Sequence, residues 1–179
     1  MVEQLFVESV IKRFEGYKTL AEKTFDQLTE EQMHQQPNEA SNSIAIIIQH
    51  VHGNLLSRWS NFLTEDGEKP WRNRDAEFEV QQLSKSQLLQ RWNEGAAIVL
   101  QTLAALQPED LAKTITIRNE PLVVIDVINR HLSHYSYHVG QIVYLGKWLK
   151  DKDWQSLSIP KGSSQEFNEQ MIMPGLKTT

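Results

Sequence analysis

The chain has 179 residues, a length that suits one domain with a sizeable hydrophobic core. Charged residues make up 23% and the formal net charge is −5 without any basic run, which argues against direct binding to nucleic acid. There is no cysteine, so disulfides, thiolate metal ligands and a cysteine nucleophile are excluded. No signal-peptide pattern and no apolar run of membrane-spanning length is visible, so we expect a cytoplasmic protein without a membrane partner.

Four long segments carry apolar residues at three- and four-residue steps, the spacing of an amphipathic helix. Serine residues supply N-cap candidates before the second segment (Ser41 or Ser43) and the third (Ser84 or Ser86). The expected helices cover residues 3–28, from one of the first two serines to about 63, from one of the second two to about 106, and 122–150. Four such segments predict an all-α fold, a four-helix bundle. Gly140 interrupts the last helix, where we expect it to allow close approach of a neighbouring helix.

The second connection, residues 64–84, is long for a compact domain, and loops of this length are often functional. It carries Arg72 and Arg74 close to aromatic residues. The two arginines either bind an anionic small molecule or pair with acidic residues of the same loop. The acidic residues within reach are Asp75, Glu77 and Glu79.

Two further segments complete the expected architecture. Thr114–Ile117 alternates polar and apolar residues and is followed by the turn-like Arg118–Pro121, which predicts a short β-hairpin before the last helix. Residues 151–179 are polar, and we expect a mostly irregular tail that packs on the same domain. The bundle domain itself is expected over residues 1–150.

The last predicted helix carries three of the chain's six histidines. Each residue of an α-helix turns about 100°, so His131, His134 and His138 share one stripe about 60° wide. Histidines at positions i and i+4 direct their imidazoles to a common point, as in helical metal sites. Two ligands rarely hold a metal alone, so a third is expected from another element, with His50 and His52 as the best candidates.

The spacing leaves the third ligand open. By helical angle alone His52 lies nearer the centre of the apolar stripe of its helix. His50 begins a polar row that continues four and eight residues later with Asn54 and Arg58. Such a row is typical either of a lined cleft or of an ordinary solvated face. A single helical histidine is usually a hydrogen-bonded core or surface residue, but several buried imidazoles without partners are costly, which favours a metal.

Three segments carry a resemblance to a known family. They are Gln49–Asn54, Arg58–Phe78 and His134–Ile142, in which the pattern His-x3-His followed by x-Gly-Gln is the most specific. Together they resemble the DinB/YfiT-like superfamily of metal-binding four-helix bundles, and within it an uncharacterised bacterial subgroup with a long second connection. The resemblance extends to about Phe167.

This resemblance implies a divalent metal bound by one histidine of the second helix and two of the last, namely His50, His134 and His138. His50 stands where the family has its ligand, just before the Gly-Asn pair, which overrides the angular preference for His52. Three histidines with open coordination positions suit zinc or nickel equally.

Other residues are expected around the metal. Gln141, one turn beyond the second histidine of the motif, is a candidate hydrogen-bond partner of a ligand or of bound water. His131 either lines the site or caps a neighbouring loop. Asn54 is a candidate for orienting a substrate, and Arg72 or Arg74 for binding its carboxylate.

Relatives with this bundle include thiol-dependent S-transferases and isomerases that use low-molecular-weight thiols such as bacillithiol or mycothiol. The resemblance therefore implies a small-molecule thiol and an electrophile as partners, with the thiol held as a thiolate at the metal. No residue stands out as a catalytic acid or base. The alternatives are a metal-hydroxide hydrolase and a non-enzymatic metal-binding or stress-associated protein. Exposed apolar residues on the first and third helices also predict a homodimer, the commonest symmetric assembly.

Overall fold

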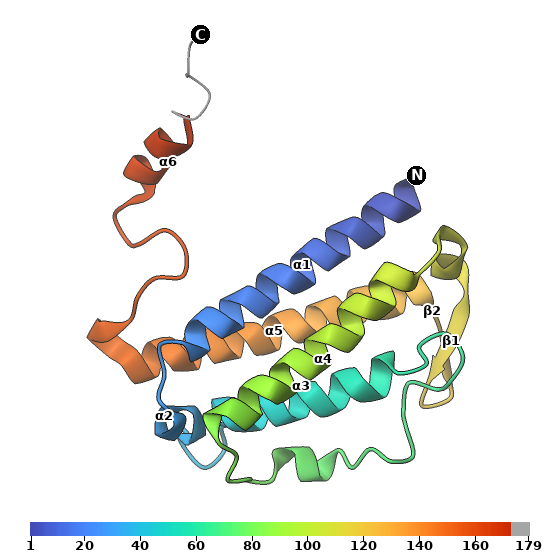
Figure 1. Ribbon diagram of the computed structural model, residues 1–179, viewed down its shortest axis with the longest axis horizontal. Helices are drawn as coiled ribbons and strands as arrows, with labels where there is room; N and C mark the ends of the chain where they lie inside the picture. The colour runs from blue at the N-terminus through green and yellow to red at the C-terminus, as the bar shows by residue number, and fades with distance from the viewer. Residues whose placement is uncertain (173–179) are drawn as a thin grey trace.

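The computed structural model describes residues 1–172, which are mostly α-helical with one small two-stranded sheet (Figure 1). The α-helices are α1 (Val2–Phe25), α2 (Glu30–His34), α3 (Ile44–Trp59), α4 (Lys85–Ala105), α5 (Val124–Lys150) and α6 (Ser164–Ile172). Three 3₁₀ turns and two strands complete the described part of the chain: η1 (Asp75–Phe78), η2 (Pro108–Ala112), β1 (Thr114–Ile117), β2 (Glu120–Val123) and η3 (Asp151–Asp153). The predicted all-α fold class is therefore confirmed.

The four long helices form a closed bundle in which α3 packs against α4, α4 against α1, α1 against α5 and α5 against α3 (Figure 1). Two of the predicted serine caps start helices. The Ser43 side chain accepts a hydrogen bond from the backbone N–H of Ile46, and Ser84 forms a capping box with Gln87. Helix α3 ends before the predicted Leu63, because the chain turns to an extended conformation after Trp59.

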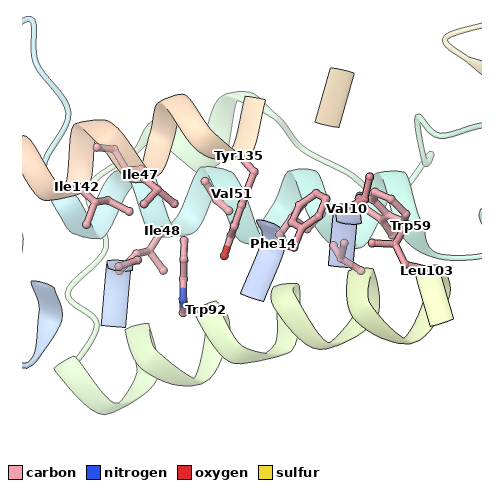
Figure 2. Packing of buried hydrophobic residues seen from close by; sticks show 14 of the residues in the cluster. Val10, Phe14, Ile47, Ile48, Val51, Trp59, Trp92, Leu103, Tyr135 and Ile142 are labelled. Atoms are coloured by element: carbon pink, nitrogen blue, oxygen red, sulfur yellow. The ribbon is translucent and has the colours of Figure 1, made fainter. Parts of the chain in front are cut away.

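Large aromatic side chains fill the centre of the bundle (Figure 2). Trp92 of α4 stacks on Tyr135 of α5 with ring centroids 5.3 Å apart, and Phe14 of α1 lies 5.2 Å from the same tyrosine ring. Tyr135 is almost completely buried, and this burial raises the pKa of its hydroxyl. The core thus holds α5 firmly by the face that adjoins its histidine stripe.

The predicted hairpin is present, with β1 and β2 paired antiparallel. Arg118 and Asn119 form its two-residue turn with φ of 57° and 62°, the left-handed pair that tight hairpins favour. The carboxylate of Asp66 accepts the backbone N–H groups of both residues at 2.8 and 2.9 Å. Ile115 and Ile117 bury the hairpin against the bundle, which stabilises an otherwise marginal element.

The expectation that Gly140 admits a neighbouring helix is wrong. A Cβ atom at this position would meet nothing within 4 Å. The tight glycine of α5 is Gly146, whose missing side chain leaves room for Thr24 and Trp154.

After α5 the chain docks briefly on the bundle. Gln155 and Gln27 exchange two hydrogen bonds of 2.9 and 3.1 Å, and Trp154 lies against α5. Helix α6 follows and stands apart from the bundle in Figure 1. The part of the predicted tail beyond residue 172 lies outside the described residues. None of the described helices combines the length and apolar character needed to cross a bilayer.

Candidate metal centre

Three histidines from two helices meet at the edge of the core. His50 of α3 and His134 and His138 of α5 each offer a ring nitrogen, and these atoms all lie within 4.8 Å of one another. The Nε2 atom of His134 lies 3.4 Å from that of His50 and 3.2 Å from that of His138. His134 and His138 sit one helical turn apart, as the i, i+4 spacing predicts, and the packing of α3 against α5 brings in His50.

The opposite ring nitrogens of two of these histidines are fixed by acceptors. His50 Nδ1 donates to Glu77 Oε2 at 2.9 Å, and His138 Nδ1 donates to Gln141 Oε1 at 2.8 Å. An ionised carboxylate and an amide oxygen can only accept, so each imidazole carries its proton on Nδ1 when it is neutral. The Nε2 lone pairs of both histidines are thereby left facing the centre, the arrangement that supports metal-bound imidazoles.

The local electrostatics keep two of the three imidazoles uncharged. Burial, with the neighbouring His138 and His50, lowers the pKa of His134 to about 3. Burial also lowers the pKa of His138 to about 4, although its hydrogen bond with Gln141 works in the opposite direction. Both imidazoles are therefore neutral at pH 7, the protonation state in which histidine binds a metal.

The donor set fits a divalent metal ion. The Nε2 atoms of His50 and His138 cannot donate, so one proton on His134 Nε2 can satisfy only one of the two short nitrogen–nitrogen contacts. A cation between the three nitrogens satisfies all of them, and three imidazoles are a common ligand set for zinc and for other borderline metals. The cluster could therefore hold a metal ion.

Glu77 fixes His50 and is itself fixed by Arg72. Arg72 Nε donates to Glu77 Oε1 at 2.7 Å and its Nη2 donates to Oε2 at 3.0 Å. Burial by itself would raise the pKa of Glu77, but the hydrogen bonds from His50 and Arg72 and the arginine charge outweigh it, so the pKa is lowered. Gly53 makes room for this carboxylate, because a Cβ atom there would lie 2.8 Å from the Glu77 carboxyl carbon.

A cavity of about 400 Å³ opens beside the histidine cluster. His50 and His134 form the end that adjoins the histidine cluster. The remaining lining is polar and comes from α3, the long connection, the hairpin turn and α5: Asn54, Arg58, Arg72, Arg74, Arg118, Arg130, His131, Ser133 and Tyr137. The cluster is therefore accessible from a space large enough for a small molecule.

The family model described as "Protein of unknown function (DUF1572)" matches residues 1–163. The chain belongs to this family. DUF1572 is DinB-like, so the predicted resemblance is confirmed at the level of the family, and the match includes all three clustered histidines. Among curated proteins none matches the chain.

The structure brings most of the sequence-predicted residues of this DUF1572 protein to the cavity. Asn54 lines it and is largely buried. Arg72 lines it as well, although two of its nitrogens are taken by Glu77. Arg74 reaches it from the surface, 4.0 Å from the carboxylate of Asp75 and with its guanidinium 5.1 Å from the centre of the Phe78 ring. The predicted pairing with acidic residues of the same loop is therefore present, and anion binding by this arginine pair stays a prediction.

The other histidines near the motifs lie outside the three-nitrogen cluster. His52 points to the opposite side of α3, where its Nε2 lies 3.2 Å from Glu94 Oε2. His131 is buried one turn before His134 and lines the cavity rather than the cluster. Neither of its ring nitrogens has a hydrogen-bond partner among the described residues.

Sequence reasoning missed three contributors. Glu77 was considered only as an ion-pair partner for the loop arginines, and its contact with His50 spans 27 positions of the chain. Arg118 lies in a hairpin turn and Arg130 at an exposed helical position, and neither location predicts a residue of the site. The one indication in the sequence is that Arg130 directly precedes the histidine motif.

Proposed function

We propose that this DUF1572 protein is a metal-dependent enzyme that transfers a low-molecular-weight thiol to an electrophilic small molecule. The proposed ligands are the Nε2 atoms of His50, His134 and His138, and the proposed ion is zinc or nickel. The observation that carries the proposal is the convergence of three imidazoles at the wall of a polar cavity. A thiol-transfer reaction fits a cysteine-free chain, since the sulfur nucleophile comes from the cosubstrate.

The described residues favour an open coordination site over a closed structural one. A closed site needs a fourth protein ligand, and the other histidines of the same two helices, His52 and His131, are the nearest candidates in the sequence. His52 faces Glu94, and His131 lies outside the group of mutually close ligand atoms. Glu77 contacts the far side of the His50 ring, so it positions the ligand instead of closing the site.

A divalent ion in such a site supplies a Lewis acid that favours the thiolate over the thiol at neutral pH. In the proposed transfer the thiol loses its proton to solvent, and its sulfur forms a bond to the electrophilic carbon. The bond from that carbon to the leaving group breaks, and the leaving group departs with the electron pair. Asn54, four residues after His50, lines the cavity and would orient the cosubstrate by hydrogen bonding through its amide.

Metal analysis tests the first half of the proposal. Untagged protein should contain about one zinc or nickel per chain, as a single three-histidine site requires. His138→Ala should lose the metal while keeping the helical circular dichroism of the parent. His52→Ala is the matched control, since it removes a histidine of α3 that faces Glu94, and it should keep the metal.

An activity screen tests the second half. The metal-loaded protein is incubated with low-molecular-weight thiols and a chromogenic electrophile, and thioether formation should depend on His138. A protein that holds its metal but forms no thioether would contradict thiol transfer. Hydrolysis of an ester or amide by the same sample would identify a hydrolase instead. Metal retained by His138→Ala would contradict the proposed ligand set.

We also propose a homodimer as the assembly. Large exposed apolar side chains occur on α1 (Val2 and Leu5), as predicted. The others expected on the third long helix are absent from the described residues of α4, and α5 carries Tyr144 and Trp148 instead. Light scattering at micromolar concentration should give twice the chain mass of 20.7 kDa, and a monomer mass would contradict the proposal.

A further inference from the structure

We propose that the cavity beside the histidine cluster binds a small compound with at least two negative charges, a dicarboxylate or a phosphate monoester, through Arg72, Arg118 and Arg130. This inference deepens the proposed function, because it names the class of substrate that would reach the metal. It rests on the proposed function only for the reactive end of that substrate. The arginine end of the cavity is supported by observations that do not involve a metal.

The first observation is the distribution of positive charge. The chain is acidic, with 23 Asp and Glu residues against 18 Lys and Arg. Only seven of the latter are arginines, and five of these seven line this one cavity, whereas no lysine does. Among residues 1–172, no carboxylate side chain lines it either. An arginine cluster of this kind, gathered from four separate parts of the fold, is typical of a site for carboxylate or phosphate groups.

The second observation concerns which guanidinium groups remain available. Glu68 Oε2 accepts from Arg58 Nη2 at 2.9 Å and from Arg118 Nε at 2.8 Å. Arg72 uses Nε and Nη2 for Glu77, but its buried Nη1 has no hydrogen-bond partner. The guanidinium of Arg130 has no ion-pair partner in the part of the chain that the structure describes. Three of the five arginines thus keep donors free for a ligand.

The third observation is a set of unpaired polar atoms in buried side chains that line the same cavity. Asn54 Oδ1, Arg72 Nη1 and both ring nitrogens of His131 lack hydrogen-bond partners among the described residues. The side chain of Arg72 is only 2% exposed and His131 is only 4% exposed, so bulk water does not reach these two side chains freely. Buried polar groups in native proteins are nearly always paired, so these atoms indicate a polar ligand.

The charge balance specifies a dianion. Five guanidinium groups line the cavity. The carboxylates of Glu68 and Glu77 are hydrogen-bonded to three of them, and the Asp75 carboxylate lies 4.0 Å from Arg74, which leaves two positive charges in excess. A monoanion would leave half of that excess uncompensated. The volume of about 400 Å³ admits a small metabolite rather than a polymer.

Calorimetric titration of the full chain at low ionic strength tests the inference. The probes are succinate and phenyl phosphate as the two dianions, and butyrate as a monoanion with the same carbon count as succinate. At least one dianion should bind about ten times more tightly than butyrate, and the stronger of the two identifies the preferred acidic group. Equal binding of butyrate and both dianions, or no dianion binding at millimolar concentration, would overturn the inference.

A pair of arginine variants places the binding site. Arg130→Gln removes a cavity guanidinium that holds no other residue, so the fold should be unaffected and dianion affinity should fall about tenfold. Arg13→Gln makes the same charge change at an exposed position of α1 and should leave the affinity unchanged. An equal effect of the two variants would show a non-specific charge effect and contradict the proposed site.

The same titrations with chelator-treated and metal-loaded protein separate the two proposals. Dianion binding that persists without metal supports the arginine site even if no enzyme activity is found. Stoichiometric metal with no dianion binding contradicts the arginine site while leaving the metal centre intact.

Discussion

The two ends of the cavity carry side chains of opposite chemical character. The histidine end presents nitrogen atoms from three imidazoles, and two of those imidazoles are oriented by acceptors behind them. The arginine end presents five guanidinium groups, with no carboxylate among its described lining residues. One end is therefore suited to a cation and the other to an anion.

The charges of the arginine end also act on the histidine end, because the two ends lie close together. The positive charges of Arg72 and Arg58 help to lower the pKa of His134, after burial and the neighbouring histidines. These charges therefore help to keep the His134 imidazole unprotonated and able to bind a metal, although the same charges oppose a bound cation. Glu77 joins the two ends, because it accepts from His50 on one side and from Arg72 on the other.

Glu77→Gln removes the carboxylate charge that joins the two ends, and we expect it to have the largest effect. Loss of the charged partner of His50 weakens the orientation and basicity of that ligand, so metal affinity should fall by roughly 10–100-fold. Competition with a chromogenic chelator measures the dissociation constant. Glu94→Gln is the matched control, since it removes the carboxylate beside His52, and it should bind metal like the parent. Equal metal affinity in both variants would mean that Glu77 does not support a ligand.

Acid should destabilise the metal-free protein through the buried histidines. Burial lowers the pKa of His131 to about 3, and His134 and His138 are lowered to about 3 and about 4. The unfolded chain binds protons near pH 6.5 whereas the folded chain does not, so the stabilisation is complete above that pH and declines as the pH falls towards 4. Each histidine contributes at most about 1.4 kcal/mol per pH unit, less where it is partly exposed.

Urea unfolding of chelator-treated protein at pH 7.5, 6.5 and 5.5 measures this dependence. His131→Gln removes one titrating group and should flatten the decline below pH 6.5. A free energy of unfolding that stays constant from pH 7.5 to 5.5 would show that the histidines accept protons within the fold.

The smallest expected effect on the metal comes from a methyl group at Gly53. Gly53→Ala pushes against the Glu77 carboxyl group, which is the flexible end of its side chain, so metal affinity should fall only a few-fold. Gly140→Ala is the control in α5, the other helix of the histidine cluster, where the new methyl group meets open space. It should leave metal affinity unchanged and raise the free energy of unfolding by up to about 1 kcal/mol. Chelator competition measures the metal affinity of both variants, and urea unfolding measures their stability. A loss of metal affinity in Gly140→Ala would contradict the assignment of the Gly53→Ala effect to its contact with Glu77.

The sequence by itself determined the features that depend on neighbouring residues. Apolar periodicity predicted the four long helices, and serine residues marked two helix starts, which the structure places at Ser43 and Ser84. The i, i+4 spacing placed His134 and His138 on one stripe. These features are local, because a helix fixes the relative direction of residues three or four positions apart.

Contacts between residues that are distant in the sequence could be seen only in the tertiary structure. Angle alone favoured His52, but the packing of α3 against α4 and α5 turns His52 towards Glu94 and His50 towards the cluster. The contact between His50 and His134 spans 84 positions, and the path of the long connection brings Glu77 behind His50. Such contacts follow from how the core packs and how each loop runs, and no short-range pattern encodes them. The arginine end of the cavity, assembled from a helix, a loop, a hairpin turn and a second helix, depends on the tertiary structure for the same reason.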